Sequence, residues 1–239
     1  MIRPLIAALT CFQQTITPGD HSLRVERIHL GVDTIVVLVK KPRADEQLLT
    51  TLVRRVERDG DLVRIVQRYE SPDGEWEYDT VEVSARTLAL LRSVEVAATT
   101  TRTLHFDGAR LTGTFSSEGV PPTAIDERPG AFFPEAATEA LLAAYPIGAG
   151  AVVVFPEMST TNLAVHPASL MVDSTASIVT ADGWIDCFVA HGQGQETLWV
   201  ARGDGRLVRE RWIERDGTVM WKLPRRDVPF RHEGYVSVR

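Results

Sequence analysis

The 239-residue chain has few of the features that usually reveal a function. It contains two cysteines, whereas a disulfide scaffold uses more of them in a shorter chain. Its net charge is −6 and no basic cluster is longer than two residues, which argues against a nucleic-acid partner. No apolar run approaches the roughly 20 residues that a membrane-spanning helix needs. With 44% hydrophobic residues, the composition indicates an ordinary globular protein.

Motifs for metals, nucleotides and hydrolysis are also missing. The six histidines form no His-x-His or His-x₃-His pair, so no spacing supports a metal site. The stretch "PIGAGA" at 146–151 lacks the lysine and the following helix of a phosphate loop. No serine lies in a Gly-x-Ser-x-Gly elbow. We therefore expect no metal and no cofactor.

The N-terminal segment, residues 1–19, leaves three alternatives open. In "MIRPLIAALTCFQQT", Arg3 precedes a six-residue apolar stretch, Pro4 to Leu9, which is short for a secretory signal. The segment is then a packed helix or strand, a remnant of an export signal, or a lipidated Cys11. A disulfide between Cys11 and Cys187 requires the N-terminus to fold back onto the body.

Turn signals dominate the rest of the chain. Asp-Gly, the strongest short-range hairpin signal, occurs six times between β-rich runs. The pairs are Asp59-Gly60, Asp73-Gly74, Asp107-Gly108, Asp182-Gly183, Asp204-Gly205 and Asp216-Gly217. Turns spaced about 10–15 residues apart predict consecutive strands that pair antiparallel, as a meander.

One Ala-rich segment interrupts this pattern. In "PEAATEALLAAYPI", residues 134–147, Leu141, Leu142 and Tyr145 recur near helical spacing. The sequence therefore predicts an all-β protein: a large antiparallel meander curled into a barrel or half-barrel, with one short helix near 134–145. We favour a single domain over residues 20–224, followed by a C-terminal tail at 225–239. Two smaller β units joined by the helix are the alternative.

Several phrases together resemble an uncharacterised family of bacterial cell-envelope proteins. They are "RTLHFDGARLTGTF", a Pro-rich loop, "LLAAYPIGAGAVVVFP" and "LWVARGDGRLVRERW…DGTVMWKL". In that family a large antiparallel sheet curls around a helix, in the manner of the lipoprotein-localisation carriers. The resemblance covers about residues 20–224. It implies an exported protein that binds something apolar or serves as a structural envelope module, and it supplies no catalytic residues.

His105 and Asp107 are the weak catalytic candidates. In "TLHFDG" they lie two apart on a predicted strand, so both side chains point to one face. A histidine beside a carboxylate is half of a constellation that orients a general base. Turn chemistry at Asp107-Gly108 explains the same aspartate without any catalysis.

The aromatic strands carry the ligand-binding prediction. In residues 75–83, Trp76 and Tyr78 alternate with carboxylates, and the alternation then slips near Thr80, as at a bulge. The run 207–213 has mixed faces, which suit a curved sheet around a partly hydrated interior. The predicted ligand-binding residues are Trp76, Tyr78, Trp199, Arg209, Arg211, Trp212 and Trp221. For Arg209 and Arg211, pairing with glutamates on a solvated neighbouring strand is the competing interpretation.

Three functions are compatible with these features. The favoured one is a non-catalytic binding or carrier module of the cell envelope for a lipophilic or amphiphilic small molecule. A hydrolytic enzyme with a His/Asp/hydroxyl site and a structural or interaction domain are the alternatives. The resemblance implies a periplasmic or secreted location, whereas an N-terminus that is no signal implies a cytoplasmic one. The sequence specifies no oligomeric state.

Overall fold

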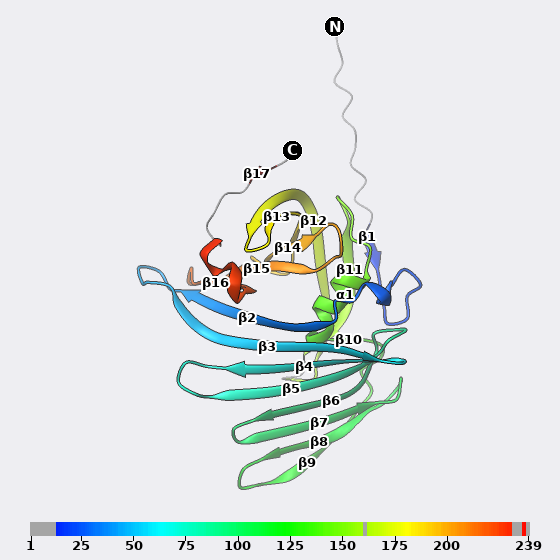
Figure 1. Cartoon of the computed structure of the whole chain (residues 1–239). Helices are drawn as coiled ribbons and strands as arrows, with labels where there is room; N and C mark the ends of the chain where they lie inside the picture. The colour runs from blue at the N-terminus through cyan, green and yellow to red at the C-terminus, as the bar shows by residue number, and fades with distance from the viewer. Residues whose placement is uncertain (1–12, 160–161, 231–235, 238–239) are drawn as a thin grey trace.

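The computed structural model describes residues 13–159, 162–230 and 236–237, and these fold around one large, strongly curved sheet (Figure 1). The first group of strands is β1 (Gln13–Thr15), β2 (Gly31–Lys40), β3 (Gln47–Asp59), β4 (Leu62–Glu70), β5 (Trp76–Ser84), β6 (Leu90–Ala97), β7 (Thr100–Phe106), β8 (Leu111–Ser117), β9 (Val120–Glu127) and β10 (Phe133–Pro134). The second group is β11 (Val152–Met158), β12 (Val165–Thr180), β13 (Gly183–His191), β14 (Thr197–Ala201), β15 (Leu207–Ile213), β16 (Val219–Pro224) and β17 (Val236–Ser237). The helical elements are the α-helix α1 (Thr138–Ala144) and three 3₁₀ turns, η1 (Val25–Arg27), η2 (Glu135–Ala137) and η3 (Arg225–Phe230).

Two antiparallel meanders make up the sheet. The N-terminal meander runs from β2 to β9 and the C-terminal meander from β11 to β16, each strand pairing with the next. They join where β16 pairs antiparallel with β2, Val219 opposite Lys40 through Pro224 opposite Ile35. The prediction of an all-β antiparallel fold with one short helix is therefore confirmed. The sheet is curled but not closed, because β9 lies at one end and β11, with the short strands β1 and β10, lies at the other.

The predicted hairpin turns are present. All six Asp-Gly pairs lie where two antiparallel strands meet, and all six glycines have positive φ angles. An L-residue with a Cβ adopts this conformation only at a cost, which is why glycine is required there.

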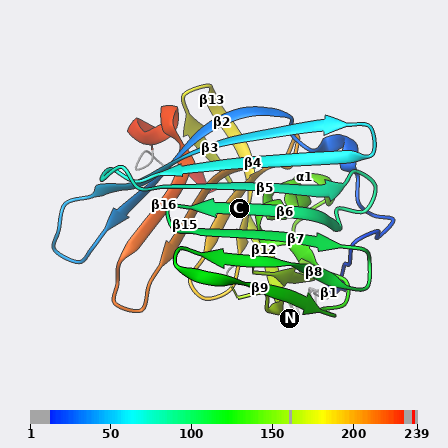
Figure 2. The same ribbon diagram turned by 90° about the horizontal axis from the view of Figure 1, so that it is seen from below.

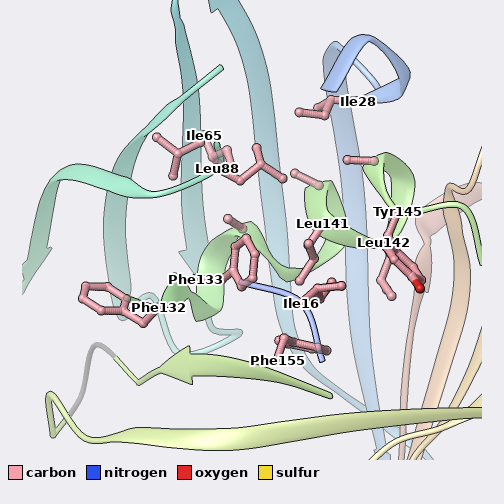
Figure 3. Close-up of a cluster of buried hydrophobic side chains, with 14 of the residues drawn as sticks. Ile16, Ile28, Ile65, Leu88, Phe132, Phe133, Leu141, Leu142, Tyr145 and Phe155 are labelled. Carbon is pink, nitrogen blue, oxygen red and sulfur yellow. The ribbon is translucent and has the colours of Figure 1, made fainter. Parts of the chain in front are cut away.

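Helix α1 is enclosed by the curl of the sheet. Figure 2 shows the N-terminal meander as one broad layer with α1 behind it. The larger apolar cluster surrounds the helix, with Leu141 and Leu142 packing among side chains from both meanders, such as Ile65 and Phe155 (Figure 3). A second apolar cluster, which includes Trp199, Trp221 and Cys187, lies on the other face of β14–β16. Strand β14 separates the two clusters, and all five of its residues are buried.

The expected slip of alternation near Thr80 is wrong. Strands β4 and β5 keep one unbroken register, from Leu62 opposite Ser84 to Glu70 opposite Trp76. The side chains that share a face with buried Val81 and Val83 are therefore Asp79 and Glu77, not aromatic residues. The sequence pattern misleads here because a carboxylate, Asp79, is buried on the inward face of the strand, while Glu77 on the same face is exposed near the strand's start.

The chain outside 20–224 also contacts the sheet. Strand β1 pairs parallel with β11, and Ile16 is fully buried. The first part of the C-terminal tail forms η3, whose Asp227 is buried and accepts a hydrogen bond from the Ala181 N–H at 2.8 Å. Cys187 is buried, but Cys11 lies outside the described residues, as do the first twelve positions of the N-terminal segment.

Strand β9 is the exposed end of the sheet. It pairs with β8 on one side, and within the described residues no strand covers its other side. Most of its side chains are exposed, and it contains Pro121 and Pro122.

Gly205 is expected to determine the packing of α1. Its φ is +76°, and a Cβ placed on it would lie 2.9 Å from the Ala143 Cα. The Gly205→Ala variant should therefore lose more stability in chemical denaturation than Gly74→Ala, which has a similar φ of +89° but open space around it. We expect about 1 kcal/mol for Gly74→Ala and at least about twice that for Gly205→Ala. Equal losses would show that the contact between this turn and the helix does not matter.

Candidate functional site

An acidic cavity of about 350 Å³, partly open to solvent, lies between α1 and the two meanders. Its walls come from β4, β5, η2, α1, β11, the segment before β14, and β14–β16. Seven carboxylate residues line it: Glu77, Asp79, Glu135, Glu139, Glu157, Glu196 and Glu210. Lys222 is the one lysine or arginine among the described lining residues. The cavity is therefore strongly acidic.

Glu139 of α1 forms ion pairs with both meanders near the point where they join. Its carboxylate is ion-paired with Arg54 of β3 and lies 2.9 Å from the Lys222 Nζ of β16. Arg54 also contacts the Asp33 carboxylate at 3.2 Å, and Lys222 reaches Glu210 at 3.5 Å. Two cations therefore balance Glu139 and hold α1 against the strands that meet at the β16–β2 pairing.

Glu157 of β11 also has partners. The Thr138 hydroxyl donates a hydrogen bond to its Oε1, and its Oε2 lies 3.5 Å from the His166 Nε2. This contact connects the first turn of α1 to the C-terminal meander. Glu157 is therefore fixed in place and partly compensated.

Asp79 is the most buried of the seven carboxylates, and among its described neighbours the Thr80 N–H is the donor that stabilises its charged form. Its side chain is only 7% exposed, and its Oδ1 has no hydrogen-bond partner among the described residues. Burial is the main cause that raises its pKa to about 7, and the charges of Glu95, Glu77 and Glu135 add to the effect. A buried acceptor without a donor is costly, and a hydrogen-bond donor placed beside this oxygen would remove that cost.

Other carboxyls of the cavity are perturbed in the same direction. Burial raises the pKa of Glu196, and the nearby carboxyl of Glu210 raises it further. Burial likewise raises the pKa values of Glu77 and Glu135, each with a neighbouring glutamate as the next cause. Carboxyls whose pKa values are raised by confinement together are typical of functional sites.

Part of the cavity wall is apolar. Leu142 of α1 and Leu198 of β14 are buried, and Leu207 of β15 is partly buried beside them. The cavity thus offers both a carboxylate-rich surface and a leucine surface.

Four of the predicted ligand-binding residues come together, but on the other face of β14–β16. Trp199 and Trp221 stack with ring centroids 6.0 Å apart, and the Arg211 guanidinium carbon lies 5.6 Å from the Trp221 ring centroid. Arg209 is 2% exposed and donates to the Val179 carbonyl at 3.2 Å. These side chains lie together in the second apolar cluster and do not line the acidic cavity.

The other three predicted ligand-binding residues are dispersed. Trp76 and Tyr78 are exposed on the outer face of β5, where Tyr78 lines an open depression over β4–β6. Trp212 is partly buried opposite Met220.

The two catalytic candidates lie where β7 turns into β8. His105 is exposed on β7. The Asp107 carboxylate accepts hydrogen bonds from the Ala109 and Arg110 N–H groups at 2.9 and 2.8 Å, which lower its pKa. Turn formation therefore accounts for Asp107, and neither residue lines the acidic cavity.

Two further features bear on the kind of site. Across the described parts of the chain, no three His, Cys, Asp or Glu side chains converge in a way that could hold a metal ion. No helix in the same residues is long and apolar enough to cross a membrane.

Sequence reasoning missed the carboxylates of the cavity. Glu77 and Asp79 seemed solvent-facing because they alternate with Trp76 and Tyr78. The available signal was the valine pair at 81 and 83, whose face Asp79 shares without a slip of alternation. Glu196 and Glu210 gave no signal of their own, because only the tertiary fold brings them to the cavity.

Comparison with known proteins supports the fold. No protein-family model matches the chain, and no curated protein matches its sequence. Among solved structures, it is similar to a β-barrel-like protein of a domain of unknown function, DUF1849, from Brucella abortus. The similarity covers 82% of this chain and 97% of that chain, with a TM-score of 0.52 and 10% sequence identity. It supports the β-barrel-like part of the resemblance noted from the sequence. The likeness to lipoprotein-localisation carriers stays a prediction.

The raised pKa of Asp79 predicts how stability depends on pH. Because the folded state holds this proton up to about pH 7 and the ordinary value is 3.8, the free energy of unfolding falls as pH rises between these values. The neutral Asp79→Asn variant should lose much of this dependence. The stability of the variant relative to the wild type should therefore be greater at about pH 8 than at about pH 5, by about 2.6 kcal/mol at most, because only about two pH units separate pH 5 from the raised pKa.

Urea denaturation at the two pH values measures this effect. Asp45→Asn, at an exposed loop position, is the control and should follow the wild type. An Asp79→Asn variant with the wild-type pH profile would contradict the assignment.

Proposed function

We propose that this protein is a non-catalytic binding or carrier module for a small amphiphilic ligand, held in the acidic cavity. The observation that carries the proposal is the cavity itself, about 350 Å³ between α1 and both meanders and partly open to solvent. Its volume falls in the range of roughly 300–1,000 Å³ typical of small-molecule sites. The β-barrel-like fold is compatible with such a module.

The cavity supports an amphiphile better than a wholly lipophilic molecule. The apolar space beside Leu141, Tyr145 and Phe155 amounts to only about 10 Å³, roughly one water molecule. The roomy cavity instead combines carboxylates with the leucines of α1, β14 and β15. A ligand with a polar head and a short apolar part satisfies both surfaces.

A location in the bacterial cell envelope is part of the proposal. Its support is the layout-level resemblance over residues 20–224. Fractionation of the source cells, with the protein followed by antibody, should place it in the periplasm or the medium. Recovery in the cytoplasm alone would overturn this location and leave the binding proposal intact.

Filling the cavity should abolish ligand binding. Ala136 of η2 is partly buried in the cavity wall, so Ala136→Phe places a ring in the space that the ligand needs. Native mass spectrometry of protein purified from its source should show a co-purifying small molecule in the wild type and none in the variant.

Ala124→Phe, on exposed β9, is the matched control and should retain the ligand. Circular dichroism and thermal melting would verify that both variants fold. The proposal fails if the wild type carries no small molecule and also binds none of the amphiphiles tested below.

A further inference from the structure

We propose that the ligand's polar group is an organic cation, a primary ammonium or a guanidinium, bound at Asp79 and its neighbours. This inference rests on the proposed function and names the chemical class of the ligand. The ligand is accordingly an amphiphilic amine whose apolar part contacts the leucine surface.

The charges of the cavity leave room for an added cation. Of the seven carboxylates that line it, Glu139 has two cationic partners, Arg54 and Lys222. Glu157 has Thr138 and His166.

Of the remaining five carboxylates, Glu77 and Glu135 are exposed at the edge of the cavity, whereas Asp79, Glu196 and Glu210 are buried or partly buried. The cavity contains one lysine among its described lining residues, Lys222, which already contacts Glu139 and Glu210. Such an excess of negative charge around one cavity favours a cationic ligand.

Asp79 provides the specific recognition site. It is buried, lines the cavity, and its Oδ1 lacks a hydrogen-bond donor within the described chain. An ammonium group offers three N–H donors and no acceptor, so it can donate to carboxylates on several sides. The same carboxylates repel an anionic head group and gain less from a neutral one. A hydrogen bond from a charged donor to a buried carboxylate is among the stronger ones in proteins.

The spread of the carboxylates favours an organic cation over a metal ion. Within the described residues no three acidic, imidazole or thiol groups converge closely enough to hold a metal. The leucine surface formed by Leu142, Leu198 and Leu207 offers no donor atom to a metal ion. An alkyl amine uses both surfaces.

Protons compete with this cation. Titratable or charged groups face Asp79 from each element around it. They are Tyr69 on β4, Glu77 on β5, Glu95 on β6 and Glu135 on η2. Arg102 on β7 lies one step further away, ion-paired with Glu95. Raising the pH from about 6 to about 8 deprotonates Asp79, while an alkylammonium stays charged. Affinity for the amine should therefore rise several-fold over this interval.

Calorimetric titration with three amphiphiles of equal chain length tests the inference. Decylammonium, decanoate and decyl maltoside, each below its micelle concentration, differ only in the charge and size of the head group. We expect decylammonium to bind at least about tenfold more tightly than the other two.

Two outcomes separate this inference from the function on which it rests. Equal binding of all three amphiphiles, abolished by Ala136→Phe, would overturn the cationic assignment while the binding function stands. No binding of any amphiphile to the wild type would overturn both.

A pair of variants assigns the effect to Asp79. Asp79→Asn should weaken decylammonium binding about tenfold or more and reduce its rise with pH, of which Glu196 keeps a part, and it should leave decyl maltoside binding unchanged. Glu118→Gln, at an exposed turn between β8 and β9, is the control and should behave as the wild type. If Asp79→Asn folds and binds decylammonium as the wild type does, the inference is wrong.

Discussion

The rest of the structure depends on the pairing of β16 with β2. These strands are nearly the whole chain apart in sequence, yet six consecutive residue pairs fix their register. The pairing turns two meanders into one curled sheet and encloses α1 between them. It also assembles the acidic cavity, because Tyr69 and Asp79 come from one meander and Glu196 and Glu210 from the other. Neither meander alone contains the site.

Strands β14–β16 have the second apolar cluster on one face and the acidic cavity on the other. On one face, Trp199, Arg211 and Trp221 pack together among apolar neighbours. On the opposite face, Glu210 and Lys222 border the cavity. The mixed pattern of residues 207–213 therefore reflects a strand with neighbours on both sides. The carboxylates of the cavity oppose their own burial, and a fold that keeps such groups together is typical of a functional site rather than of a core.

The sequence allowed the fold to be predicted but not the residues of the acidic cavity, and the reason is physical. Asp-Gly turns and β-rich runs are local signals, so they identified the hairpins, and the helical spacing of Leu141, Leu142 and Tyr145 identified α1. Which face of a strand points inward is decided by tertiary packing. The aromatic residues Trp76 and Tyr78 therefore predicted the inward face of this strand wrongly, because both are exposed and Asp79 is buried. Contacts such as Arg54–Glu139 join elements that no local pattern connects.

The exposed end of the sheet at β9 has a consequence for self-association. An open strand edge normally invites a strand from another molecule, because its N–H and C=O groups are free to extend the ladder. Pro121 and Pro122 lack N–H groups, so this edge cannot offer an uninterrupted row of donors. The two prolines therefore oppose the addition of a strand from another molecule at β9, although the barrel is not closed there.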